Sequence, residues 1–486
     1  MAEIQTMKQK DFVLNLCILL FLNLLVKPIW LLGVEVGVQN QVGAAEYGLF
    51  FSIYNFSYIF YMLLDMGICS YNNRSVARDN RLLDSYLSSI IMLRLVLCLF
   101  YFVVIYTIAL LIGYRGVQLK LLFWIGLNQF LNATMLYLRS NVSALMMFKT
   151  DSLLSVLDRV LAILFCSMLL WGHVTERPFQ IEWFVYSQTA AYLIAIAVAL
   201  AVVLRKTSLR KFSWDRALCL SILKKSLPFA LMSLLMVCYY RIDSVMLERL
   251  LPTEIATTQA GIYASAFRLL DALLIVAYLF SVILLPLFSR MLKEKENIQP
   301  IVRTSFALLF LYSVTMVVML LCYRTPVMQF LYKEHVAESV SVFSVLVCGL
   351  IPYSFTYLFG TLLTANGSIR TMNIISAVGI GVNLIINLVM IPRYQAVGAA
   401  ITSLCTLSVV SLLQWFVAMR ELKVPFRTLP WIPALLFTVL LVPLALLSTR
   451  WLPGNLLLSL SIVLVMAFLL ALATRLLRFS DAKQLI

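Results

Sequence analysis

Long apolar stretches separated by short loops fill this chain, and they decide what it can fold into. About fourteen such stretches lie between Phe12 and Leu477. A helix that crosses the hydrocarbon core of a membrane needs about 20 predominantly apolar residues. The composition agrees, because 62% of the 486 residues are hydrophobic and only 12% are charged, against about 25% charged in soluble domains. The protein must therefore act inside or across a bilayer.

The pattern predicts an all-α polytopic membrane protein with about fourteen transmembrane helices. The expected spans are 12–34, 46–69, 85–111, 119–142, 151–172, 181–204, 226–250, 260–288, 301–323, 338–364, 371–391, 395–418, 430–448 and 454–476. The first span is too long for the apolar core of a cleaved signal peptide, and it contains Lys27 and Pro28. We therefore expect it to be retained.

The distribution of Lys and Arg among the loops predicts the orientation. One set of alternate loops carries 25 of these residues, and the opposite set carries 8. Short loops rich in Lys and Arg stay in the cytoplasm, so we expect a multi-pass protein with both termini cytoplasmic. This bias accounts for most of the net charge of +16. Because no basic domain stands free of the membrane, we expect no nucleic-acid partner.

The most basic loop, 205–225, carries seven Lys or Arg residues and one Asp, and it divides the spans into groups. We expect an N-terminal six-helix lobe at 1–204, a basic cytoplasmic linker at 205–225, a C-terminal six-helix lobe at 226–420, and two further helices with a cytoplasmic tail at 421–486. The linker is either an amphipathic helix on the inner leaflet or a solvated connector. Two six-helix lobes around a central cavity are typical of transporters built from related halves.

Residue types that carry catalysis are sparse. The nine cysteines form no CxxC pair, and the only two histidines, His173 and His335, fall in predicted outer loops. The sequence has no Walker A loop and no dinucleotide-binding glycine motif. We therefore expect no catalytic residue, no metal site, no cofactor and no enzymatic activity.

Three blocks of sequence carry a resemblance to a known family. The first block is Gly43–Phe50 with Asp65–Gly67 and Asn73–Arg78; the second is Lys224–Ala230 with Tyr240–Leu247 and Gly261–Arg268; the third is Asn383–Pro392 with Val397–Thr402. In this order, and with this number of spans, they resemble the polysaccharide-transport family, of the Wzx type. This family belongs to the multidrug/oligosaccharidyl-lipid/polysaccharide (MOP) exporter superfamily. The resemblance covers nearly the whole chain.

The resemblance implies a flippase of the bacterial inner membrane. Its substrate would be an undecaprenyl-pyrophosphate-linked oligosaccharide repeat unit of O-antigen (lipopolysaccharide), capsule or exopolysaccharide. Members move this lipid from the inner to the outer leaflet by alternating access, driven by an ion gradient or membrane potential. The expected partners are the lipid-linked oligosaccharide and membrane lipids, with the polysaccharide polymerase and chain-length proteins of the pathway as further candidates.

Charged residues within spans are expensive in a bilayer, so each is a candidate functional residue. The candidates for substrate binding are Lys27, Arg94, Arg159, Arg241 and Arg268, and those for coupling or gating are Asp65, Asp243 and Asp271. At about 1.5 Å per residue, Arg241, Asp243, Arg268 and Asp271 lie roughly 10–16 Å below the outer ends of their spans. We expect these four residues to share one layer, where cations would meet an anionic pyrophosphate.

Structural readings compete with these roles. Arg268 and Asp271 are three residues apart and would neutralise each other on one helix face. Arg94 would extend to the inner headgroups, and Asp65 would cap a helix end or pair with a loop. A run of aromatic residues in the second span, from Phe50 to Tyr61, would either line a glycan path or simply pack against lipid and neighbouring helices.

Three other functions remain open at this level. An ion-coupled multidrug exporter of the same superfamily would share the fold, but its cationic substrates favour acidic residues. We count five basic against four acidic residues in the spans, with no glutamate, which favours an anionic substrate. A lipid II flippase would carry an Arg-rich first span, which is not found. A membrane-embedded glycosyltransferase or polymerase would need a large outer loop, and the outer loops here are short.

Overall fold

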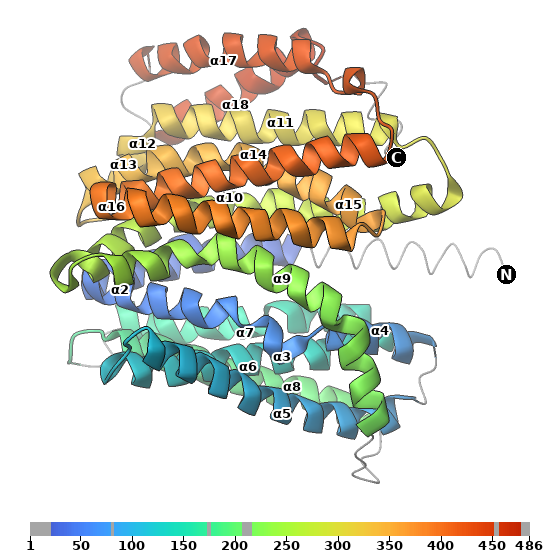
Figure 1. Cartoon of the computed structure of the whole chain (residues 1–486). Helices are drawn as coiled ribbons and strands as arrows, with labels where there is room; N and C mark the ends of the chain where they lie inside the picture. Colours follow the sequence, from blue (N-terminus) through green and yellow to red (C-terminus); the bar gives the residue numbers. More distant parts are fainter. Residues whose placement is uncertain (1–20, 79–81, 173–175, 207–215, 452–455, 478–486) are drawn as a thin grey trace. The chain divides into compact units, whose positions relative to one another are not determined.

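The computed structural model describes residues 21–78, 82–172, 176–206, 216–451 and 456–477 (Figure 1). Within these ranges the regular elements are helices, with no strand. Eleven helices in this part of the chain are long and apolar enough to cross a membrane, and Leu458–Ala473 is a shorter apolar helix. An all-α polytopic membrane fold is therefore confirmed, while the count of fourteen spans stays a prediction.

The chain folds into a succession of helices with short connections. In order they are η1 (Ile29–Glu35), α2 (Val36–Ile59), α3 (Met62–Asp65), α4 (Ile68–Arg78), α5 (Leu82–Leu111), α6 (Val117–Ala144), α7 (Phe148–Trp171), α8 (Ile181–Leu204), α9 (Arg216–Leu250), α10 (Thr253–Glu294), α11 (Gln299–Cys322), α12 (Arg324–Leu331), α13 (Val336–Leu346), η2 (Val347–Gly349), α14 (Leu350–Phe355), η3 (Thr356–Gly360), α15 (Thr361–Ala365), α16 (Ile369–Glu421), η4 (Phe426–Thr428), α17 (Trp431–Trp451) and α18 (Leu456–Ala473).

The chain divides into two compact units, Met1–Gly261 and Ile262–Ile486, with the boundary inside α10. In unit 1, α6 packs against α4, α7 and α8, and α2 packs against α9. In unit 2, α16 packs against α13, α14 and η3, and α11 packs against α14 and α17. The division into lobes at 1–204 and 226–420 stays a prediction.

The predicted linker 205–225 is only partly described, since 207–215 lie outside the described residues. From Arg216 onward the chain is already helical and continues without interruption as α9. The C-terminal half of this segment is therefore the first part of the α9 helix. Figure 1 shows that α9 bends along its length.

Backbone breaks divide the helices of unit 1. Gly43 has φ 82° and ψ 168° inside the helix that runs from Phe21 to Ile59, and glycine adopts this conformation without steric cost. The segments on its two sides correspond to the first two predicted spans. The second span is shorter than predicted, because α2 ends at Ile59 and left-handed residues at Met66 (φ 41°) and Gly67 (φ 76°) separate α3 from α4.

A close helix crossing in unit 1 depends on two glycines. A Cβ atom on Gly48 of α2 would lie 1.9 Å from the carbonyl oxygen of Thr257, and one on Gly261 would lie 2.0 Å from that of Ala44. The Gln39 amide also donates to the carbonyl oxygen of Gly261, at 3.0 Å. The backbones of α2 and the first turns of α10 are thus in direct contact at Ala44, Gly48, Thr257 and Gly261.

Unit 2 contains the longest helix of the described chain. At about 1.5 Å per residue, the 53 residues of α16 would span more than two bilayer cores. The helix breaks at Gln395 (φ 51°, ψ −130°), three residues after Pro392. The break separates the predicted spans 371–391 and 395–418, and each part has the length of one crossing.

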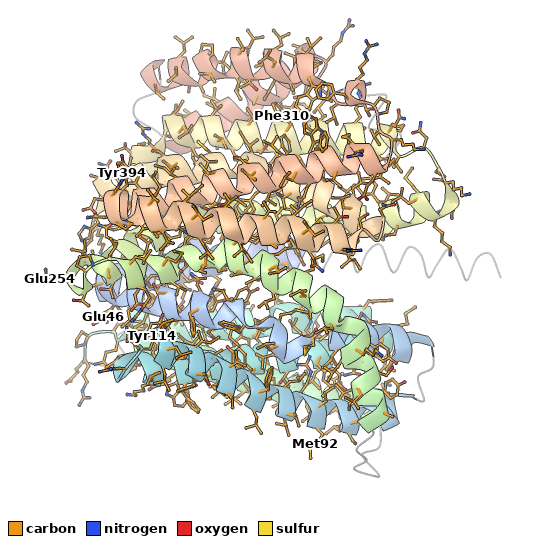
Figure 2. All side chains as sticks on the ribbon, in the orientation of Figure 1. Glu46, Met92, Tyr114, Glu254, Phe310 and Tyr394 are labelled. Carbon is orange, nitrogen blue, oxygen red and sulfur yellow. The ribbon has the colours of Figure 1, made fainter. Side chains whose placement is uncertain are left out.

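Apolar side chains cover the outer faces of the helices. In unit 1, Met92 points away from the bundle (Figure 2), and 39% of this residue is exposed. Leu99, Leu111 and Phe123 are similarly exposed. These side chains give the isolated protein an apolar outer surface, which lipid tails would cover in a membrane. Glu46, Tyr114 and Glu254 lie together at one end of unit 1, where predicted outer loops fall.

Candidate functional site

Three half-buried tyrosines of unit 1 form a row along one side of α2. Tyr54 and Tyr58 are four residues apart, which places them on one helix face, and Tyr61 follows in the turn after α2. The ring centroids of Tyr54 and Tyr58 are 5.9 Å apart, and those of Tyr58 and Tyr61 are 5.4 Å apart, with nearly parallel planes. We call these three residues the tyrosine row.

Two arginines from other helices border the tyrosine row. The guanidinium carbon of Arg241, on α9, lies 5.6 Å from the Tyr58 ring centroid. Arg159, on α7, lies within electrostatic reach of Tyr54, as does Arg241. The Arg159 guanidinium also faces Trp30, at 5.4 Å, and Tyr192, at 6.0 Å. Aromatic faces stabilise a cation where water is scarce, so these contacts make arginine tolerable within a span.

Lys27 belongs to the same region. It lies within electrostatic reach of Arg159, Arg139 and Asp158. Pro28 follows it and directly precedes η1, a π-helical segment over Ile29–Glu35. A proline inside a helix removes a backbone hydrogen bond and distorts the helix, and the π-helix is a local distortion of the kind found often at functional sites. We call Lys27, Arg159 and Arg241 the basic group.

Acidic residues accompany the basic group. Asp158 lies 3.6 Å from the Nε of Arg159, and Glu35 lies within electrostatic reach of Arg159. Asp158 also lies within electrostatic reach of Lys27, and the buried Asp243 stands two residues from Arg241 on α9. The basic group is partly accessible, since 29% of the Arg159 side chain is exposed. Such a group can exchange an internal carboxylate partner for an anionic ligand.

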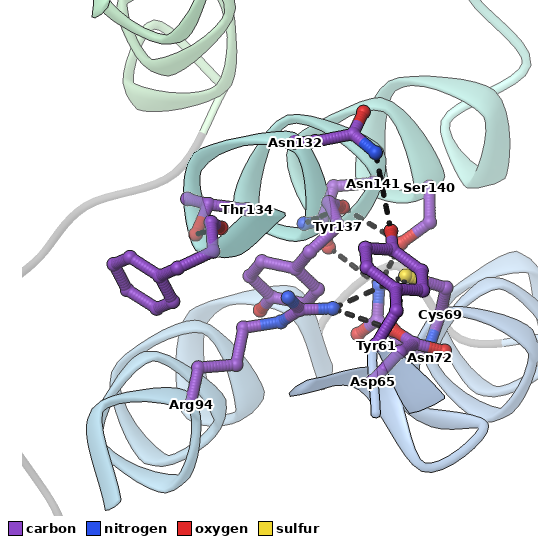
Figure 3. A network of polar contacts seen from close by, with 11 residues as sticks. Tyr61, Asp65, Cys69, Asn72, Arg94, Asn132, Thr134, Tyr137, Ser140 and Asn141 are labelled. Carbon is purple, nitrogen blue, oxygen red and sulfur yellow. Dashed lines mark hydrogen bonds and ion pairs between the residues drawn. The ribbon is translucent and has the colours of Figure 1, made fainter. Parts of the chain in front are cut away.

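Arg94 and Asp65 form an ion pair in unit 1 (Figure 3). The Arg94 Nη2 donates to the Asp65 Oδ1 at 2.6 Å, and the same oxygen accepts the Cys69 thiol at 2.7 Å. The guanidinium lies 5.0 Å from the Tyr137 ring centroid, and only 2% of Arg94 is exposed. Arg94 therefore does not extend to the headgroups. Asp65 caps a helix end as expected, because its Oδ1 accepts the backbone N–H of Cys69 in the first turn of α4 at 3.3 Å, and it also pairs with Arg94 of α5. Their roles toward substrate or coupling stay predictions.

The remaining candidates divide between the units. Asp243 is 1% exposed and belongs to unit 1 with Arg241, whereas Arg268 and Asp271 belong to unit 2. Arg268 is 2% exposed and donates from Nη1 to the Tyr332 hydroxyl at 3.0 Å, and that hydroxyl donates to the Ser265 carbonyl oxygen. The predicted common layer of Arg241, Asp243, Arg268 and Asp271 stays a prediction.

Glutamates were missed by the sequence reasoning. The expectation that no glutamate lies within the spans is wrong, because Glu248 of α9 is only 7% exposed. It accepts hydrogen bonds from Gln118 at 2.7 Å and from Arg249 at 2.6 Å. Glu35 lies within the first long helix and accepts a hydrogen bond from the Tyr47 hydroxyl at 3.0 Å. Glu248 was visible in the sequence as a member of the predicted span 226–250.

A polar pocket opens beside the Arg94–Asp65 pair. It measures about 310 Å³ and lies between the α3–α4 segment, the C-terminal part of α6 and the start of α7. Its lining contains Tyr61 of the tyrosine row and a second ion pair, in which the Arg139 Nε donates to Asp151 at 2.9 Å. The sequence reasoning singled out neither residue of this pair. No group of side chains suited to hold a metal ion occurs among the described residues.

The N-terminal part of the chain matches a family profile described as polysaccharide biosynthesis protein, over residues 12–292. The chain belongs to this family. The predicted family resemblance is thereby confirmed. A search among curated proteins found no match to this chain.

Solved structures share the fold of this family member. A lipid II flippase, MurJ, in an inward closed conformation aligns with a TM-score of 0.71 and 14% identity, covering 96% of this chain and 97% of that one. An inward-facing multidrug transporter of the MATE family and the MOP superfamily aligns with a TM-score of 0.62 and 15% identity, covering 83% and 98%. A MOP superfamily transporter from Pyrococcus furiosus, with a binding pocket of reverse polarity, aligns with a TM-score of 0.60 and 16% identity, covering 85% and 95%. At these identities the likeness shows the fold.

Proposed function

We propose that this protein is a flippase for undecaprenyl-pyrophosphate-linked oligosaccharides. It would carry repeat units of O-antigen, capsule or exopolysaccharide from the inner to the outer leaflet of a bacterial inner membrane, by alternating access. Membership in the polysaccharide biosynthesis family supports this proposal, as does the fold shared with a lipid II flippase. The observation that carries it is the basic group beside the tyrosine row.

The chemistry of the substrate explains why such a group is needed. A lipid-linked sugar has an apolar tail that stays in lipid, but its pyrophosphate and glycan cannot cross hydrocarbon unaided. Lys27, Arg159 and Arg241 would replace water around the pyrophosphate with charge-assisted hydrogen bonds. The tyrosine rings beside them would offer flat faces for sugar rings and hydroxyl groups for hydrogen bonds.

A multidrug exporter is the alternative within the same fold. Cationic drugs would be repelled by the positive charges of Lys27, Arg159 and Arg241. The glutamates Glu35 and Glu248 moderate this argument, but Glu248 is already bonded to Arg249 and Gln118. The charge of the basic group therefore favours an anionic substrate.

A complementation assay tests the proposal. The chain is expressed in bacteria that lack their own repeat-unit flippase, and surface polysaccharide is measured at matched protein levels. We expect the native chain to restore polysaccharide, Arg241→Ala and Arg268→Ala to reduce it at least tenfold, and Arg241→Lys to retain part of it. Arg393→Ala, at an exposed arginine of unit 2, is the matched control and should behave as the native chain.

The outcomes separate the hypotheses. Restoration that is unaffected by the Arg241 and Arg268 substitutions would keep the function and reject these two residues as substrate contacts. Resistance to cationic dyes without restored polysaccharide, in hosts with several different repeat units, would replace the flippase proposal with the exporter.

A further inference from the structure

The polar pocket of unit 1 has the accessibility and the volume of a ligand site. Nearly all of its lining side chains are partly exposed, so a ligand can reach them. Its volume of about 310 Å³ lies at the lower end of the range of ligand pockets, about 300–1,000 Å³. Its lining residues are Tyr61, Met62, Asp65, Cys69, Asn73, Leu136, Arg139, Ser140, Ser143 and Asp151.

Several polar groups of the lining can form further hydrogen bonds. The Asp65 and Asp151 carboxylates each receive their hydrogen bonds on Oδ1, and the Arg139 guanidinium donates from Nε alone, among contacts with described residues. The side chains of Asn73 and Ser143 make no hydrogen bond to a described residue, although both line the pocket. Donors and acceptors together thus line the hollow, carried largely by planar side chains, among wall surface that is mostly apolar.

The charges around the pocket balance. Two ion pairs, Arg94–Asp65 at 2.6 Å and Arg139–Asp151 at 2.9 Å, balance the two carboxylates of its walls; Arg139 lines the pocket, and Arg94 is buried behind Asp65. A pyrophosphate would face Asp65 and Asp151 directly and be repelled by them. A neutral ligand rich in hydroxyl groups would instead satisfy carboxylates, amide and guanidinium together, because each hydroxyl both donates and accepts.

The position of the pocket connects it with the basic group. Tyr61 belongs both to the pocket lining and to the tyrosine row, and the rings of Tyr58 and Tyr54 follow it toward Arg241 and Arg159. Seven residues separate Tyr54 from Tyr61, a distance on the order of 10 Å along a helix. One ligand with an anionic part and a neutral polyhydroxyl part could therefore occupy both regions of unit 1.

We infer that the polar pocket lined by Tyr61, Asp65, Asn73, Arg139, Ser143 and Asp151 binds a neutral sugar ring of the substrate, while the basic group holds the pyrophosphate. This inference rests on the proposed flippase function and assigns a place in unit 1 to the glycan. The pocket lies where α6 ends and α7 begins, at the end that the Lys and Arg distribution predicts to be cytoplasmic. The sugar would accordingly be bound at the side where substrate is loaded.

Equilibrium binding to the purified full-length protein in lipid nanodiscs tests this inference. The two ligands are a short-chain polyprenyl pyrophosphate and the same lipid carrying one N-acetylglucosamine. The test variant is Asn73→Ala/Ser143→Ala, which removes two lining side chains without removing an internal hydrogen bond between described residues. The matched control is Asn297→Ala/Ser289→Ala, two exposed residues near the end of α10.

For the native protein we expect the sugar-bearing lipid to bind about tenfold more tightly than the bare pyrophosphate lipid. Because two hydrogen bonds to neutral groups are lost, the test variant should bind the sugar-bearing lipid about tenfold more weakly and the bare lipid unchanged. Lys27→Ala should weaken both ligands by the same factor, and the control variant should weaken neither.

Three outcomes would overturn the inference. An unchanged preference for the sugar in the Asn73→Ala/Ser143→Ala variant would place the sugar elsewhere, with the flippase proposal intact. Equal native affinities for the two lipids would show that no sugar subsite exists. Absence of binding to both lipids would contradict the proposed function itself, and the inference with it.

Discussion

At the scale of single residues, the charged side chains of unit 1 divide into two kinds. Arg94 is buried and tied to Asp65, whereas Arg159 is partly accessible and faces aromatic rings. A buried ion pair contributes little net stability, but removing one partner leaves an uncompensated charge and is strongly destabilising. The two kinds should therefore respond differently to substitution.

Replacement of Asp65 tests this distinction. We expect Asp65→Ala to destabilise the purified protein by about 3 kcal/mol, because Arg94 is left buried without its counter-charge. The double variant Asp65→Ala/Arg94→Met should recover most of the loss. Thermal unfolding in detergent is the measurement. Equal destabilisation by the single and double variants would show that packing, rather than charge, dominates at this position.

A second residue-scale effect concerns the backbone at Gln395. Its φ of 51° and ψ of −130° are unfavourable for a residue with a side chain, at a cost of order 1–3 kcal/mol. We expect Gln395→Gly to raise the melting temperature of the purified protein. Ala396→Gly, one residue later, introduces a glycine without relieving strain and should lower it. A fall in melting temperature for both variants would argue against strain at Gln395.

At the scale of helices, breaks within the helices of unit 1 decide where its polar side chains lie. Gly43 divides the first long helix, Met66 and Gly67 end α3, and a π-helical turn follows Pro28. These breaks position Tyr61, Asp65 and Cys69 around the polar pocket instead of along one regular helix. The helix crossing of α2 with the first turns of α10 is also close, because a Cβ atom on Gly48 or Gly261 would overlap backbone atoms of the other helix.

Alanine substitution measures the requirement for this crossing. Gly48→Ala places a Cβ 1.9 Å from the Thr257 carbonyl oxygen, so the two backbones must separate and apolar contacts are lost. We expect destabilisation of about 3 kcal/mol or more, at the upper end of single substitutions. Fluorescence-detected size-exclusion chromatography after heating is a suitable assay.

Gly381→Ala is the matched control, since a Cβ at this helical glycine meets nothing within 4 Å. It should be neutral or stabilising by up to about 1 kcal/mol, the difference between alanine and glycine in a helix. If Gly48→Ala is as stable as Gly381→Ala, the close crossing of α2 and α10 does not hold.

At the scale of the whole molecule, the chain is a membrane protein of the polysaccharide biosynthesis family with a fold shared by MOP transporters. Its orientation is predicted from the loops alone. Exposed positions in two loops offer a direct test: Glu176 lies in a predicted outer loop, and Glu296 lies in a predicted cytoplasmic loop.

Cysteine labelling measures this orientation. In a variant whose native cysteines are replaced, we expect Glu176→Cys to react with a membrane-impermeant maleimide in spheroplasts. Glu296→Cys should react only after the membrane is permeabilised, because the Lys- and Arg-rich loops are retained in the cytoplasm. The reverse labelling pattern would place the termini outside the cytoplasm and invert the proposed loading side of the polar pocket.

The sequence by itself determined the all-α membrane class, most of the spans and the family. These properties follow from local composition, since about 20 apolar residues make a span in any context, and from motifs that stand contiguous in the chain. Gly43 and Pro392 both fall between predicted spans, close to the points where the helices break. The candidate charges were also visible, because any charged residue within an apolar stretch is conspicuous.

Only the tertiary structure decided which of these residues meet. Arg94 pairs with Asp65 across 29 residues of chain, and Gln118 bonds Glu248 across 130. Helices that are apolar on every side carry no periodic signal of which face is buried, so neither these pairs nor the polar pocket follow from the pattern. The helix breaks and the glycine crossing set the register between helices, and that register brought Tyr61, Arg139 and Asp151 to one pocket.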